Sequence, residues 1–380
     1  MLVLGLESSC DETAAALITR ESGASGPNCG WRLLAEVVSS QIDLHAKYGG
    51  VVPELASREH LSNFPLVVDQ VLRDAGVGVE DLTHVGVTCG PGLKGCLLIG
   101  VGFARGLAMA RGLPLLGVNH IEGHLLAAQL EHPDLSFPFL ALVVSGGHTE
   151  LVEVRKLGEY TILARTIDDA AGEAFDKSAH LLGLPYPGGP QLSRLAEGAD
   201  PELQKALFRE LPKVMRDSEG FSFSGLKTAI ALLVRRQAQN LANDAKYRPA
   251  LAAAIQDAIV GALIEKVALA LREIGPGHGS PKRLVVTGGV AANSELRRRV
   301  QEIKGARAFF PALGHCVDNA AMIAYAAALR FSGGAIASYS PQILSRWPVE
   351  LCLPPGALFA TVSSQGNSER VQTLKKNEPR

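Results

Sequence analysis

The same short pattern occurs in both halves of this chain: an apolar strand, a turn of small polar residues and a second apolar strand. The first copy is LVLGLESSCDETAAALIT near the N-terminus, and the second is FLALVVSGGHTELVEV at 139–154. Each copy is followed by a third strand-like segment and then by segments in which helical and strand patterns alternate. A duplicated βββαβα unit of this kind predicts an α/β fold with two similar lobes.

The duplication also predicts where the chain divides. We expect an N-terminal lobe over residues 1–134 and a C-terminal lobe over 135–317, the latter interrupted by a helical segment at about 198–247. A helix and an end segment should follow over 318–353, and the polar stretch 354–380 is typical of a disordered tail. Two lobes with facing polar turns resemble the actin-like ATPase (ASKHA) architecture, whose turns hold the phosphates of a nucleotide. Such a fold does not by itself determine the chemistry.

Composition and charge argue against several classes of protein. The net charge of −1 gives no overall basic field for nucleic acid, although a local basic face would not alter that total. The six cysteines form no C-x-x-C pair, which favours a reduced cytosolic protein over a disulfide framework. The sequence contains no signal-like N-terminus and no apolar run of the ~18–20 residues that span a bilayer. We therefore expect a soluble, cytoplasmic protein that needs no membrane.

The segment NHIEGHL indicates a metal site. His120 and His124 are four residues apart and lie on one face of a predicted helix, where two imidazoles either chelate one cation or form an ordinary polar face. Asp318, at the start of the last predicted helix, adds a third ligand, and this donor set suits one divalent metal, Fe(II) or Zn(II). A metalloprotease requires a glutamate directly after the first histidine. Glu122 comes one position too late and points away from the metal face.

The polar turns of the two copies are candidate substrate sites. In the second turn, Ser145, Gly146 and Gly147 offer a hydroxyl and accessible backbone amides to an anion, although an ordinary hairpin also favours Gly-Gly. In the first turn, Asp11 and Glu12 cannot bind phosphate directly. They suit attraction of a cation, orientation of water or a substrate hydroxyl, or action as a base.

Two further segments carry candidate nucleotide contacts. GGVAAN follows a predicted strand and opens a helix, so Asn293 is either a nucleotide ligand or an ordinary helix cap. Acids at a helix start usually complement the helix dipole, but Asp176 lies deeper in its helix and suits a ribose hydroxyl. The segment YPGGP predicts a rigid turn with room for a base or a ribose at Gly189.

Together these segments resemble the Gcp family, the tRNA N6-adenosine threonylcarbamoyltransferases. The resemblance runs from residue 1 to about 351 and is carried by MLVLGLESSCDETAAAL, GGVVPELASREH, NHIEGHL, LVVSGGHTEL, IDDAAGEAFDK, YPGGP, FSFSGLKTA, VTGGVAANSELR and DNAAMIAYAA. Two positions depart from the family pattern. Val317 stands where the family carries a threonine before the metal aspartate, and the residues beyond Leu353 have no counterpart.

The resemblance implies a defined reaction. The threonylcarbamoyl group of threonylcarbamoyl-adenylate would pass to N6 of adenosine 37 in tRNAs that read codons beginning with A, and AMP would be released. The resemblance implies Fe(II) on His120, His124 and Asp318, the acidic pair Asp11 and Glu12 in catalysis, and TsaB and TsaE homologues as partners. It places the adenylate on Val143, Val144, Ser145, Gly146, Gly147, Asp176, Gly189 and Asn293.

Two other functions fit the same predicted fold. An actin-like kinase of small molecules would share the phosphate turns, but it gives no reason for the set of His120, His124 and Asp318. A nucleotide-gated scaffold subunit would have no need of metal ligands, and all three are present here. The ligand set therefore favours the transferase.

Overall fold

The computed structural model describes residues 1–356 except 22, 24–29, 213–219, 276 and 278–281. In the first lobe the elements are β1 (Leu2–Glu7), β2 (Glu12–Arg20), β3 (Trp31–Ser40), α1 (Ile42–Ala46), α2 (Pro53–Ala75), η1 (Val79–Asp81), β4 (His84–Gly90), α3 (Lys94–Arg111), β5 (Leu115–Asn119) and α4 (His120–Glu131). In the second lobe they are β6 (Phe139–Val144), β7 (Thr149–Lys156), β8 (Glu159–Arg165), α5 (Ala171–Leu181), α6 (Gly188–Ala196), α7 (Pro201–Glu210), α8 (Ser224–Arg236), α9 (Ala238–Asn243), α10 (Tyr247–Glu273), β9 (Lys282–Thr287), η3 (Gly289–Ala292), α11 (Ser294–Gln301), β10 (Ala306–Phe309) and α12 (Leu313–Cys316). The chain ends with α13 (Ala320–Ser332) and η4 (Val349–Leu351).

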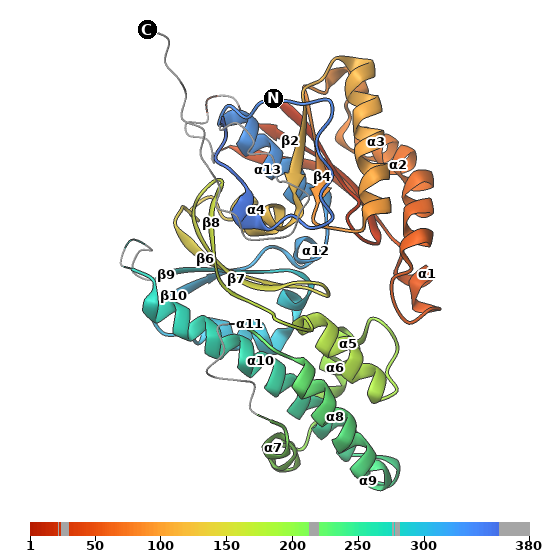
Figure 1. Ribbon diagram of the computed structural model, residues 1–380, viewed down its shortest axis with the longest axis vertical. Coiled ribbons are helices and arrows are strands. Elements are labelled where there is room, and N and C mark those ends of the chain that lie inside the picture. The colour runs from red at the N-terminus through yellow and green to blue at the C-terminus, as the bar shows by residue number, and fades with distance from the viewer. Residues whose placement is uncertain (22, 24–29, 213–219, 276, 278–281, 357–380) are drawn as a thin grey trace, which may run out of the picture.

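Each lobe contains one five-stranded sheet, and the two sheets have the same topology (Figure 1). The first has the order β3-β2-β1-β4-β5, and the second, taken from its other edge, has the order β8-β7-β6-β9-β10. In both, the first three strands pair antiparallel and the last two are added in parallel. The predicted duplication of a βββαβα unit is thus confirmed, and this strand order is that of the actin-like fold.

Helices from both ends of the chain cover the first sheet. Helices α2 and α3 pack on one face, while α13 contacts β1, β2 and β4 from the other (Figure 1). The first ten residues of α13 are all buried, and most of them are alanines. Small side chains allow this close approach, so α13 completes the core of the first lobe.

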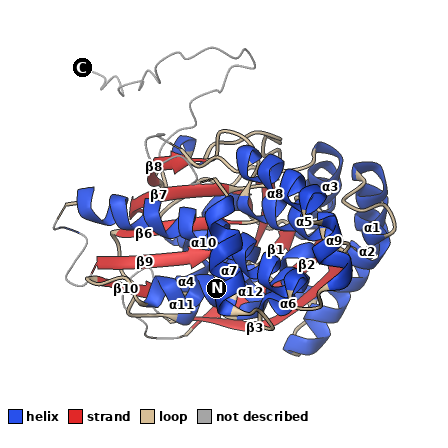
Figure 2. Ribbon diagram, turned by 90° about the horizontal axis from the view of Figure 1, so that it is seen from below, coloured by secondary structure: helices blue, strands red, loops and turns tan. Residues whose placement is uncertain are grey.

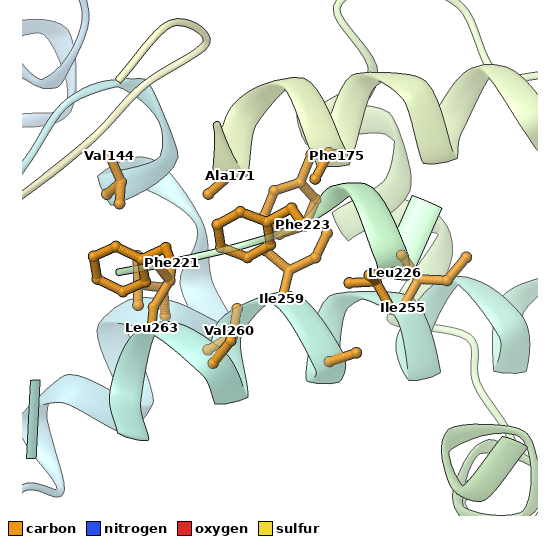
Figure 3. Packing of buried hydrophobic residues seen from close by; sticks show 14 of the residues in the cluster. Val144, Ala171, Phe175, Phe221, Phe223, Leu226, Ile255, Ile259, Val260 and Leu263 are labelled. Atoms are coloured by element: carbon orange, nitrogen blue, oxygen red, sulfur yellow. The ribbon is translucent and has the colours of Figure 1, made fainter. Parts of the chain in front are cut away.

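The second sheet is buried on both faces, as its continuous apolar strands predict. Along β6, Leu140, Leu142 and Val144 pack into the cluster formed by α5 and α10, whereas Ala141 and Val143 pack towards α4. Figure 1 shows α4 above these strands and α10 and α11 below them, and Figure 2 shows the same strands from below. The inserted segment contributes to this core, because Phe221 and Phe223 fill the space between α5 and α10 (Figure 3).

Helix α4 lies between the two sheets and positions the predicted metal ligands. It contacts β5 of the first lobe, β6 and β9 of the second, and α13. Asn119 caps its N-terminus, because the side-chain oxygen accepts from the amides of Ile121 and Glu122. The helix therefore begins at His120, and both histidines lie in its first turns.

One local prediction is wrong. The segment YPGGP does not form a simple turn, because α6 begins at Gly188, directly after the cis peptide bond that precedes Pro187. The Asp176 carboxylate accepts hydrogen bonds from the amides of Gly188 and Gly189 at 2.8 and 3.1 Å. A side chain from α5 thus satisfies the free amides that open this helix.

Two further expectations concern a membrane span and the C-terminal tail. No helix in the described ranges is long and apolar enough to cross a membrane. The predicted tail 354–380 lies outside the described residues from position 357 onward.

Candidate metal and substrate site

A cavity of about 1920 Å³ lies between the lobes and collects most of the predicted site residues. The turn after β1 and the start of α4 form one wall, and the turn after β6, α5, α6 and the η3–α11 region form the other. Predicted site residues that line it are Asp11, Glu12, His120, Ser145, Gly146, Gly147, Asp176, Gly189, Asn293 and Asp318. Val143, Val144 and His124 do not line it.

His120, His124 and Asp318 converge on one point. One ligand atom from each lies within 4.8 Å of the others. The Asp318 Oδ1 atom is 3.3 Å from Nε2 of His120 and 3.1 Å from Nε2 of His124. Within the described part of the chain, this is the one such group of histidine, cysteine and acidic side chains. Segments almost two hundred residues apart therefore build a single three-ligand site, which is compatible with one metal ion.

Glu7, a fully buried residue at the end of β1, orients His120. Its carboxylate lies 3.0 Å from Nδ1 of His120 and also accepts from the Thr88 hydroxyl at 2.6 Å and the Ser9 amide at 2.5 Å. A carboxylate behind a metal-binding histidine fixes the tautomer that leaves Nε2 free for the metal. Glu7 was not among the site residues predicted from the sequence. The available signal was an acid at the end of an otherwise apolar strand.

The electrostatics of the group favour a bound cation. Burial opposes charge on His120, but Asp318 and Glu7 raise its pKa well above the ordinary value. Burial alone would raise the pKa of Asp318, yet His120 and His124 hold it well below its usual range. Without a metal, the site therefore retains a proton between two carboxylates. Because a metal must displace such a proton, its binding releases protons.

The donor set fits a divalent cation of intermediate softness. Two imidazole nitrogens and one carboxylate oxygen, with the cavity on their open side, are the ligands that Fe(II) and Zn(II) share. Only the second histidine lacks support behind its ring, because Nδ1 of His124 is buried without a hydrogen-bond partner among the described atoms. Its ring is held by packing and by the contact of Nε2 with Asp318.

The acidic pair lies in the same cavity. Asp11 is buried, and Glu12 is partly buried with its carboxyl 3.4 Å from the Ser40 hydroxyl. Burial, followed by the charges of Asp318 and Asp11, raises the pKa of Glu12 to about 9. At neutral pH the Glu12 carboxyl thus keeps its proton. Both serine hydroxyls of this turn are engaged within the protein, since that of Ser8 donates to the Cys96 carbonyl and that of Ser9 lies 3.2 Å from Nδ1 of His120.

The second turn remains accessible. Gly146 and Gly147 are exposed, with no atom within 4 Å of the position a β-carbon would take. Behind them the turn is rigid, because the Gly172 amide at the start of α5 donates to the Ser145 carbonyl at 3.2 Å. Val143 and Val144 are fully buried strand residues, so their side chains support the turn from the two cores.

The remaining predicted contacts are partly committed to the fold. The Asn293 side chain caps α11 by accepting from the Leu296 amide, and it donates to Gln256 at 2.8 Å. Asp176 uses one carboxylate oxygen to cap α6 at Gly188 and Gly189. The residues of this group that border the cavity are Asp176, Gly188, Gly189 and Asn293. The contacts of Asp176, Gly189 and Asn293 with a ligand stay predictions.

Glu122 has no part in the site. It is fully buried and accepts hydrogen bonds from the Tyr160 hydroxyl and the Arg330 guanidinium. A glutamate held in this way is not free to activate a water at the histidine pair. The expectation that it points away from the metal face is confirmed.

Fold and site together define an actin-like α/β protein whose interlobe cleft carries a candidate His₂Asp metal site beside the exposed Ser145–Gly147 turn. The family model described as TsaD, tRNA N6-adenosine threonylcarbamoyltransferase, matches residues 32–325. The chain belongs to this family and is a transferase that acts in tRNA modification. The class and the family thus agree with the resemblance found in the sequence motifs.

Relatives with the same name as the family support the family assignment over almost the whole chain. The tRNA N6-adenosine threonylcarbamoyltransferase of Bordetella petrii is 48% identical over 360 residues, which cover 93% of this chain and 99% of that protein. The protein of the same name from Geobacter sp. is also 48% identical and covers 92% of this chain and 97% of its own length.

Among solved structures, component A of the (R)-2-hydroxyglutaryl-CoA dehydratase of Acidaminococcus fermentans covers 87% of this chain and 96% of its own, with a TM-score of 0.48 and 17% identity.

Proposed function

We propose that this chain transfers the threonylcarbamoyl group of threonylcarbamoyl-adenylate to N6 of adenosine 37 in tRNAs that read codons beginning with A. AMP is the leaving product, and the reaction takes place in the cytoplasm with TsaB and TsaE homologues as partners. The observation that carries the proposal is one shared cavity, lined by His120 and Asp318 of the three-ligand group and by the exposed Gly146 and Gly147.

The proposed metal is Fe(II), with Zn(II) as the alternative, held by His120, His124 and Asp318. Such an ion supplies Lewis acidity that stabilises negative charge near the phosphate and carbamoyl oxygens. Glu7 keeps the His120 ring oriented for this purpose. The chain's own ligands thereby determine where the reacting group lies.

The remaining residues bind and orient the two substrates. The Ser145–Gly147 turn and Asn293 hold the AMP portion, and Asp176 and Gly189 contact its ribose or base. Asp11 or Glu12 orients the attacking N6 amine. The adenine must leave the stack of the anticodon loop to reach this cavity, which single-stranded loops allow at low cost.

The function is tested by reconstitution. The protein and its partner homologues are incubated with unmodified tRNA, threonine, bicarbonate, ATP and the enzyme that forms the adenylate, and the nucleosides are analysed by mass spectrometry. We expect threonylcarbamoyladenosine. Its absence under conditions in which a homologue produces it would contradict the proposal.

The metal role is tested by Asp318→Ala, with Asp69→Ala on the exposed face of α2 as the control. Loss of one of three ligands should abolish tight binding of Fe(II) or Zn(II) and, with it, the transfer. Metal content is measured by elemental analysis and transfer by the nucleoside assay. A variant that binds metal and transfers at the normal rate rules out this role for Asp318.

A further inference from the structure

His148 is the cavity residue that the proposed function leaves without a task. It is the last residue of the turn between β6 and β7, and it lines the cavity together with His120 and Asp318. Its backbone is firmly held: the His148 amide donates to the Ser145 hydroxyl at 3.1 Å, and the Ser145 amide donates to the His148 carbonyl at 2.8 Å.

The flanking residue adds a second anchor. Thr149 is fully buried, its hydroxyl accepts from the Ala171 amide at 2.8 Å, and its carbonyl accepts from the Thr166 amide at 2.9 Å. The imidazole of His148 is thus mounted on rigid backbone at the cavity wall. Such rigid support is what a group that contacts the reacting atoms requires.

The side chain itself has no hydrogen-bond or ion-pair partner within the described ranges. The ring is close enough to His120, Asp318 and His124 to feel their charges. His148 is therefore near the metal ligands, but it is not one of the three residues that converge. His148 is half-buried, and neither ring nitrogen is among the described buried atoms that lack a partner, so the ring is reachable from the cavity. An unpaired nitrogen at the cavity wall is available for a substrate contact.

We propose that His148 is the base that takes the proton of the N6 amine during the transfer; this rests on the proposed function. A bond forms between N6 and the carbamoyl carbon. The bond between that carbon and the phosphate oxygen breaks, and its electron pair leaves with AMP. The proton released from N6 passes to the free imidazole nitrogen. Asp11 and Glu12 then orient the amine without accepting its proton.

The protonation state of the ring agrees with this role. Burial lowers the pKa of His148, so the imidazole is neutral at physiological pH and its lone pair is available. A base of this strength is sufficient, because an amine becomes strongly acidic once its lone pair is bonded to the carbamoyl carbon.

The test compares His148→Ala and His148→Gln with the wild type in single-turnover transfer from preformed threonylcarbamoyl-adenylate to unmodified tRNA. We expect both variants to be slower by about 100-fold or more, which is the usual contribution of a general base. Metal content and tRNA affinity should not change. Added imidazole should partly restore the rate of His148→Ala and have no effect on His148→Gln, where the larger side chain occupies the space.

The matched control is His180→Ala, because His180 borders the same cavity from α5 but is exposed. It should transfer at the wild-type rate. The proposal is overturned if His148→Ala transfers at the wild-type rate, if its loss of rate follows an equal loss of metal or tRNA binding, or if imidazole does not accelerate it. An inactive wild type would instead contradict the proposed function, so the two failures are distinguishable.

Discussion

At the scale of single residues, the site depends on which nitrogen of His120 faces the cavity. The ring is held from behind by Glu7, itself fixed by Thr88 and the Ser9 amide. This leaves Nε2 directed towards Asp318. His124 has no such support, so the two histidines are not equivalent ligands.

Glu7→Gln should weaken metal binding by about 10–100-fold, the usual cost of losing a carboxylate behind a ligating histidine. Glutamine has nearly the same shape, so the buried position stays filled while the negative charge is lost. The measurement is a competition titration of the purified protein with Zn(II) and a chelator. The control is Glu54→Gln, since Glu54 is exposed at the start of α2. Equal metal affinities in Glu7→Gln and the wild type would show that Glu7 does not orient the ligand.

At the scale of elements, the contact between β1 and α13 links the core to the site. A β-carbon on Gly5 of β1 would lie 2.4 Å from the Ala324 nitrogen and 2.6 Å from the Ala320 carbonyl oxygen, both backbone atoms of α13. The helix starts two residues after Asp318. Any shift of α13 away from the sheet therefore also displaces a metal ligand.

Gly5→Ala should lower the free energy of unfolding by about 1–3 kcal/mol, as overpacking of a tight core does. It should also weaken metal binding, because the helix carries Asp318 with it. Chemical denaturation and metal titration measure the two effects. The matched control is Gly106→Ala in α3, where a β-carbon meets nothing within 4 Å. That variant should be more stable by about 0.5–1 kcal/mol, since alanine favours helix. If Gly5→Ala and Gly106→Ala had the same free energy of unfolding, the close contact between β1 and α13 would contribute nothing to stability.

At the scale of the whole molecule, a charged cluster connects α12 to two elements of the first lobe. His315 lies 3.1 Å from a carboxylate oxygen of Glu36 on β3 and also pairs with Glu131 at the end of α4. Glu36 in turn accepts from the Ala320 and Ala321 amides that open α13. The cluster thus fixes the segment that leads to Asp318.

The pKa of His315 is raised from 6.5 to about 10 by its hydrogen bonds to Glu131 and Glu36. A raised pKa stabilises the folded state below the ordinary histidine pKa, and this stability is lost as the pH rises through the folded value. The wild type should therefore be more stable than His315→Gln at neutral pH, and the difference should disappear as the pH approaches about 10. Urea denaturation of both proteins across this range provides the test. A difference that did not depend on pH would exclude the ion pair as its cause.

Much of the fold was predictable, because the relevant forces are local. Helices α2 and α3 and strand β4 each form from one continuous segment that carries its own apolar pattern. Apolar periodicity and end signals, such as Pro53 in the first turn and Gly76 with φ of 67° at the end of α2, are readable in one segment alone.

What the sequence determined by itself was the duplicated unit, the spacing of His120 and His124, and the composition of the turns, since each depends on neighbouring residues. Tertiary structure decided the rest. It brought Asp318 to the histidines by packing α13 on the first sheet, placed Glu7 behind His120, and turned YPGGP into the start of α6 by supplying Asp176 as a cap. These contacts join residues distant in the chain. Only burial in a common core brings them together, and no local pattern encodes which residues meet there.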